Sequence, residues 1–178
     1  LMLQAGFGWS ATEAGFLAFA TALGAFAMKP LARPILRRWG FRSVLAANGV
    51  LAAAGIGLAA LFGPHWPAAA MFAALALGGL FRSLQFTAMN TLAFAEIPRE
   101  RLSAATSFYG TAQQLPPAIG VVMATGVMEA ARHLAGREAL AIGDVQCAFL
   151  AAALVALIAA PLALRLPRDA GAEISGRG

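Results

Sequence analysis

The sequence predicts an all-α membrane protein with five transmembrane helices. Hydrophobic residues make up 60% of the chain and charged residues only 12%, whereas soluble domains carry roughly 25% charged residues. Residues 43–64, 102–128 and 145–164 carry no formal charge, and about 20 consecutive apolar residues are enough to span a bilayer as a helix. A soluble helical bundle would need polar helix faces, which these stretches mostly lack.

The first two helices are expected at about 11–29 and 43–62. Ser10 and Glu13 have the spacing of a capping box at the start of the first helix, in which each side chain bonds to an early backbone N–H. The second helix carries small residues at four-residue spacing, which lets helix backbones approach closely. These residues are Gly49, Ala53 and Gly57. We interpret them as a packing surface.

The third helix, at about 67–95, carries a single charge near its middle, Arg82. At 1.5 Å per residue this arginine lies about 22 Å from one end and about 20 Å from the other, which is the centre of a hydrocarbon core about 30 Å thick. Gln85 and Asn90 share its side of the helix, within a sector of about 140°. Ionisable residues at this depth usually face a cavity and mark a substrate pathway. The alternative is an arginine fixed in a closed interface by backbone carbonyls or a carboxylate.

The fourth helix, at about 102–128, has a stripe of small and polar residues that includes Gln113 and Gln114. We predict that both glutamines line the same cavity as Arg82. Pro116 and Pro117 remove two backbone donors and predict a kink near mid-helix, where protein or water must satisfy the freed carbonyls. The alternative is plain helix packing, in which small and amide residues are common.

The last helix is expected at about 144–165 and a disordered tail at 166–178. The single cysteine, Cys147, excludes a disulfide framework within the chain. Neither His65 nor His133 has the spacing of a metal site, and no catalytic motif is present. The sequence therefore predicts no metal, no organic cofactor and no enzyme activity.

The basic residues are sorted by side, which predicts the orientation in the membrane. Three segments, after the first helix, after the third helix and in the tail, contain ten of the thirteen, and by the positive-inside rule these segments are cytoplasmic. The ten are Lys29, Arg33, Arg37, Arg38, Arg42, Arg99, Arg101, Arg165, Arg168 and Arg177. The net charge of +5 is thus explained by loops beside an anionic leaflet, and nucleic acid is not expected as a partner.

Several stretches resemble the major facilitator superfamily. Residues 33–42 resemble the short cytoplasmic loop motif GxxxDRxGR(R/K) of that family. Arg38, Gly40 and Arg42 match the motif, while Arg33, Arg37 and Phe41 replace its Gly, Asp and Arg. The stretches Arg82-Ser-Leu-Gln85-Phe-Thr-Ala-Met-Asn90, Ser103-Ala-Ala-Thr106-Ser107 and Gln113-Gln114-Leu, in this order, resemble the C-terminal half of its fourteen-helix drug:proton antiporter branch.

The resemblance implies most of the C-terminal six-helix lobe, in residues 1–165, with a substrate cavity between two lobes near the midplane. It implies that the loop motif takes part in gating, although the aspartate that locks the family's gate is replaced here by Arg37. It also implies an N-terminal lobe of the same polypeptide as partner, a proton gradient as energy source, and a bacterial cytoplasmic (inner) membrane with the C-terminus inside. The expected partners are thus the lipid bilayer, the missing lobe and a small-molecule substrate.

The function predicted from these features is proton-coupled efflux of amphipathic drugs or metabolites. One alternative is a metabolite uniporter or exchanger of the same fold. Another is a membrane receptor or assembly module that transports nothing. Saturable efflux that is sensitive to a protonophore distinguishes the first from the other two.

Overall fold

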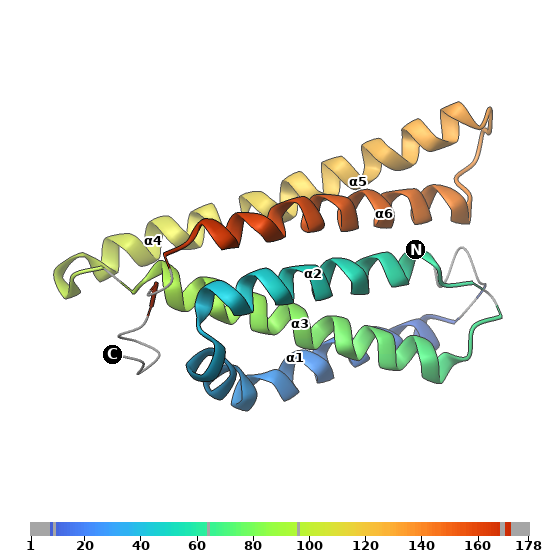
Figure 1. The fold of residues 1–178 in the computed structure, drawn as a ribbon. Helices are drawn as coiled ribbons and strands as arrows, with labels where there is room; N and C mark the ends of the chain where they lie inside the picture. The colour runs from blue at the N-terminus through green and yellow to red at the C-terminus, as the bar shows by residue number, and fades with distance from the viewer. Residues whose placement is uncertain (1–7, 9, 64, 96, 168–169, 172–178) are drawn as a thin grey trace.

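The computed structural model describes residues 8, 10–63, 65–95, 97–167 and 170–171, which form helices and no strand. The elements follow in the order α1 (Ala11–Trp39), α2 (Phe41–Ala60), α3 (Ala68–Ala93), η2 (Arg99–Arg101), α4 (Leu102–Ala112), α5 (Leu115–Leu134), α6 (Ile142–Ala159) and η3 (Ala160–Arg165). α1 packs on α3, α3 on α2, α2 on α6, and α6 on α5 (Figure 1). The capping box predicted at Ser10 and Glu13 is confirmed, with both reciprocal hydrogen bonds present.

Four helical stretches of the described residues are long and apolar enough to cross a membrane: α1, α2, α3 and Ile142–Arg165. The fourth predicted helix is not among them, because it is divided into α4 and α5. α4 has 11 residues and is therefore only about 16 Å long. α5 has Arg132 and His133 in its last turn, which lowers its apolar character toward that end.

The division between α4 and α5 lies at Gln113 and Gln114, just ahead of the prolines for which a kink was predicted. Pro116 and Pro117 stand in the first turn of α5, where a missing N–H is tolerated because helix-starting donors have no intrahelical partner. The chain thus begins a new helix at the prolines, and α5 continues to Leu134, beyond the predicted end at residue 128.

The first helix is ten residues longer than the sequence predicted, because residues 30–39 are helical although they contain Pro30 and Pro34. The buried positions of α1 recur every three or four residues as far as Leu36, and this packing outweighs the cost of the prolines. α1 ends at Gly40, whose φ of 77° is a conformation that favours glycine.

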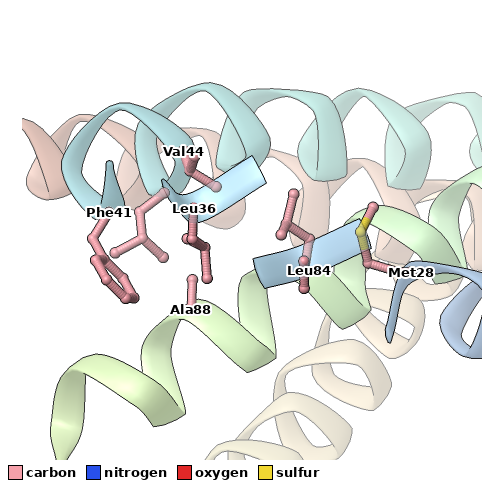
Figure 2. Packing of buried hydrophobic residues seen from close by; sticks show 8 residues of the cluster. Met28, Leu36, Phe41, Val44, Leu84 and Ala88 are labelled. Atoms are coloured by element: carbon pink, nitrogen blue, oxygen red, sulfur yellow. The ribbon is translucent and has the colours of Figure 1, made fainter. Parts of the chain in front are cut away.

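Two apolar clusters hold the α1–α2–α3 unit together, one towards each end. The first combines Met28, Ala32 and Leu36 of α1 with residues of α2 and α3 (Figure 2); the latter are Phe41, Val44, Leu45, Leu84 and Ala88. The second consists of Leu17, Ala59, Phe62 and Met71. Asn48 of α2 and Arg82 and Gln85 of α3 stand within four residues of members of the first cluster along their helices.

Small residues set the distances between helices. A Cβ built on Gly24 of α1 would lie 1.8 Å from the Ala76 carbonyl oxygen of α3, and one built on Gly79 would lie 2.0 Å from the Thr21 carbonyl oxygen. α1 and α3 are therefore in backbone contact at their crossing. The stripe predicted on α2 is also confirmed as packing surface: Gly49 lies against Ala160, and Gly57 against Ala153.

The connections alternate between two ends of the bundle. The α1–α2 corner, the α3–η2 connection and the end of η3 lie at one end, and the α2–α3 and α5–α6 connections at the other (Figure 1). The predicted basic segments thus share one end. Arg168, Arg177 and most of the predicted tail lie outside the described residues, but Leu166 at its start packs against the first apolar cluster.

Candidate functional site

A groove with a volume of about 440 Å³ lies on the side of the bundle formed by α1, α2, α3 and α6. Most of its lining consists of small or apolar side chains such as Ala52, Ile56 and Phe149. The polar side chains that line it are those of Thr21, Arg82 and Gln85. An apolar cavity with a few polar groups is the usual form of a small-molecule site.

A second groove, of about 630 Å³, is lined by α2, α3, α6 and the stretch that follows α6. Its lining reaches Leu92 and Leu166 and so extends towards the end of the bundle that carries the basic segments. Gln85, Ala52 and Met89 line both grooves. Gln85 is the one polar side chain among the described residues of the second groove, and it marks the junction of the two. We call the place lined by Ala52, Gln85 and Met89, where the two grooves meet, the junction.

Arg82 lines the first groove and its side chain is exposed. It lies 14 positions after the first residue of α3, about 21 Å along the helix. The Arg82 side chain makes no hydrogen bond or ion pair with the described residues. The alternative interpretation requires a carbonyl or carboxylate partner for this side chain, and none is found among those residues. A guanidinium in this position offers a planar fork of donors to an anionic or acceptor group.

Gln85 is held by Asn48, a residue of α2 that the sequence reasoning did not single out. Asn48 is 3% exposed, and its Nδ2 donates to Gln85 Oε1 at 2.8 Å and to the Phe81 carbonyl oxygen at 2.8 Å. The sequence did contain a signal for Asn48, since it is an amide inside an uncharged transmembrane stretch. Polar groups at membrane depth need hydrogen-bond partners, so such an amide is expected to contact another polar group. What the sequence could not show is that the partner belongs to α3.

Asn90 and Gln113, predicted to share the cavity with Arg82, form a separate pair. Gln113 Nε2 donates to Asn90 Oδ1 at 3.0 Å, and Asn90 Nδ2 donates to the Phe86 carbonyl oxygen at 2.7 Å. This pair ties the end of α4 to α3. Gln114 is exposed beside it, and none of these three lines either groove. The structure thus brings Arg82 and Gln85 together and groups the other three elsewhere.

The loop-motif residues lie at the corner between α1 and α2. Arg38 is exposed, Gly40 forms the corner itself, and Arg42 is half-buried in the first turn of α2. None of the three lines the grooves. Their place at the end of the bundle that carries the basic segments is the place that the resemblance implies for a gating loop, and the gating role stays a prediction.

An ion pair between a buried carboxylate and a partly exposed arginine, at the opposite end of the bundle, was also missed. Asp144, at the start of α6, is fully buried; its Oδ1 accepts from Arg137 Nη2 at 2.6 Å, and its Oδ2 accepts from the Ala141 N–H at 2.8 Å. A buried carboxylate requires such partners, and the pair fastens the α5–α6 loop to α6. His65 is exposed, His133 contacts Glu129, and no group of three potential ligands in the described residues could hold a metal.

Comparison with known proteins identifies the family. The model of the Major Facilitator Superfamily matches residues 1–177, and the chain belongs to this family of membrane transporters. It is 31% identical over 177 residues to a protein named "Putative multidrug resistance protein MdtD" of Cronobacter sakazakii, an alignment that covers 95% of this chain and 36% of the relative. The protein of the same name in Citrobacter koseri is 30% identical over 176 residues, again with 95% and 36% covered.

The protein of that name in Klebsiella pneumoniae is 33% identical over 128 residues, which are 70% of this chain and 26% of the relative. The chain therefore spans about a third of the length of these relatives. No solved structure matches the chain.

Proposed function

We propose that the full-length protein exports amphipathic drugs or metabolites through the bacterial cytoplasmic membrane in exchange for protons. The chain described here contributes most of the C-terminal six-helix lobe, with the C-terminus in the cytoplasm. The first groove is part of the substrate cavity, and the rest of that cavity belongs to the N-terminal lobe, as in transporters built from paired repeats with a site near the midplane.

The observation that carries this proposal is the composition of the first groove. Its lining is largely apolar, but Arg82 and Gln85 stand three residues apart on the same helix face and both line it. A molecule with an apolar body and one polar end would satisfy both kinds of surface. The names of the relatives, which refer to multidrug resistance, support the same class of substrate.

Efflux assays on the full-length protein test the proposal. Cells that lack their own major drug exporters would be loaded with ethidium, and a panel of amphipathic antibiotics would be tested for growth inhibition. We expect saturable, energy-dependent efflux of at least one compound, abolished by a protonophore. In everted vesicles, addition of that compound should dissipate an imposed pH gradient, which a pH-sensitive acridine dye reports.

Two results would contradict the proposal in different ways. Saturable flux that persists without a proton gradient, and releases no protons, would identify a uniporter or exchanger. Absence of flux for every compound, from a protein that is abundant in the membrane, would identify a receptor or assembly module.

A further inference from the structure

The Phe81 carbonyl determines which atom of the Asn48 carboxamide is the nitrogen and which is the oxygen. A backbone carbonyl oxygen accepts hydrogen bonds and cannot donate them, so the Asn48 atom 2.8 Å from it must be the NH2 nitrogen. The same nitrogen lies 2.8 Å from Gln85. Because it is a donor, Gln85 must present its oxygen to Asn48.

It follows that the NH2 group of Gln85 is directed away from Asn48. A Cβ built on Gly49, which lines the second groove, would lie 3.9 Å from Gln85 Nε2, so this nitrogen lies on the groove side of α2. Gln85 Nε2 has no acceptor among the described residues. Its donors are therefore available at the junction, in a lining that is otherwise apolar in the second groove.

The Asn48 carboxamide also carries an unused group. Its Oδ1 is buried and has no hydrogen-bond partner among the described residues, although buried acceptors are normally paired. The oxygen of this carboxamide is therefore unpaired among the described residues, while its nitrogen donates hydrogen bonds to Phe81 and Gln85. The nitrogen is thus the atom of this carboxamide that bonds to described residues, and it does so at two points of α3.

We propose that Asn48 is a positioning residue that holds Gln85 as a hydrogen-bond donor, and that the junction binds apolar molecules through an acceptor oxygen such as that of a ketone, ester or sulfone. Arg82 makes the first groove favourable for acceptors as well, but Gln85 adds a neutral donor that both grooves share. The inference deepens the proposed function and rests on it, because it names the chemical group that the substrate cavity recognises.

Photolabelling with benzophenone tests the inference on the purified full-length protein without measuring transport. The excited ketone inserts into nearby C–H bonds and reacts readily with methionine. Met89 lines both grooves and Met123 on α5 lines neither. The two methionines are similarly exposed, at 52% and 45%, so Met123 reports labelling from the detergent or lipid phase. Mass spectrometry would give the ratio of labelled Met89 to labelled Met123.

We expect this ratio to exceed one in the wild type and to fall about three- to tenfold in Gln85→Leu and Asn48→Leu, the effect of one lost hydrogen bond. Diphenyl sulfone should suppress Met89 labelling at a concentration several-fold lower than diphenylmethane, which has a similar shape and no acceptor oxygen. Size-exclusion chromatography would establish that each variant is folded.

Asn48→Asp separates orientation from packing, because it keeps the size of the side chain. A neutral aspartic acid with its hydroxyl in the place of Nδ2 donates its single hydrogen to the Phe81 carbonyl and offers Gln85 only the lone pairs of the hydroxyl oxygen. Gln85 must then turn its NH2 towards position 48 and its oxygen towards the junction. We expect Met89 labelling to fall as far as in Asn48→Leu although the interhelical contact is kept.

The matched control is Ser83→Ala, which removes a different interhelical hydrogen bond of α3, from Ser83 Oγ to the Ala25 carbonyl oxygen at 2.9 Å. It should leave the labelling ratio unchanged. An equal ratio in the wild type, Asn48→Leu and Gln85→Leu would overturn the inference, as would Met89 labelling no stronger than that of Met123. A protein that shows the expected labelling but no efflux would instead contradict the proposed transport function. The inference that Asn48 positions Gln85 as a donor would then still stand.

Discussion

Arg82 and Gln85 are two of the three polar side chains that line the first groove, the candidate site. An arginine at the centre of a transmembrane helix costs about 2.5–3.5 kcal/mol on insertion scales. In the described residues this cost is not offset by an ion pair or hydrogen bond of Arg82. The groove that it lines is open, so water and molecules bound in the groove can reach the guanidinium.

Replacing Arg82 therefore tests function more than stability. Arg82→Ala in the full-length protein should abolish efflux while its abundance in the membrane, measured by immunoblot, stays near that of the wild type. Arg82→Lys should restore little, because lysine presents a point charge instead of a planar fork.

The control for this series is Arg99→Ala, which makes the same chemical change in the exposed η2 segment and should leave efflux intact. If Arg82→Ala disappears from the membrane while Arg82→Met is stable and active, the arginine has a structural role at most, and its role in the cavity must be abandoned.

At the scale of elements, the crossing of α1 and α3 explains how these two helices are held in register. Gly24 lies against the Ala76 carbonyl and Gly79 against the Thr21 carbonyl, so each helix fits a glycine to the backbone of the other. Contacts this close gain van der Waals packing, which is a main source of helix association in lipid. They also fix the rotation of α3 about its own axis, and this rotation places Arg82 in the lining of the first groove.

Gly79→Ala should accordingly destabilise the protein by about 1–3 kcal/mol, the usual cost of overpacking. The added methyl group would lie 2.0 Å from a backbone oxygen, which cannot move without shifting the helix. The neighbouring Gly78→Ala is the matched control, because no atom lies within 4 Å of its built Cβ and alanine favours a helix by about 1 kcal/mol. Thermal unfolding in detergent would compare the two. Equal melting temperatures would mean that α1 and α3 are not in backbone contact.

For the whole molecule, the decisive pattern is the grouping of the basic segments at one end. The helices alternate in direction, so the α1–α2 corner, the α3–η2 connection and the end of η3 come together (Figure 1). The same grouping is what the positive-inside rule associates with the cytoplasmic face, and it is the basis of the proposed orientation.

Cysteine accessibility tests that orientation in the full-length protein. In a Cys147→Ser background, His65→Cys and Glu138→Cys should react with a membrane-impermeant maleimide in intact cells. Arg99→Cys should react only after lysis. All three positions are exposed, so their reactivity reports the side of the membrane. The reverse pattern would invert the topology and discredit the argument from charge.

Part of this architecture follows from the sequence alone. Uncharged stretches, the capping box at Ser10 and the depth of Arg82 depend on hydropathy and on spacing along one helix, which are local properties. The same local signals ended the first helix at about residue 29, where its uncharged run stops, although the buried stripe of α1 continues to Leu36. Packing outweighed a local preference there.

The tertiary structure decided which polar residues meet. Asn48 and Gln85 are 37 residues apart, and Gln113 and Asn90 are 23 apart; each pairing depends on how two helices are rotated about their axes. Helical periodicity places Arg82, Gln85 and Asn90 on one face, but it cannot say where a neighbouring helix covers that face. The glycine contacts at the α1–α3 crossing and the packing of α2 on α6 fix those rotations, since backbones can approach only where side chains are absent. The sequence by itself therefore determined a membrane protein with an arginine at mid-depth, and only the packing of its helices placed that arginine and Gln85 in the lining of one groove.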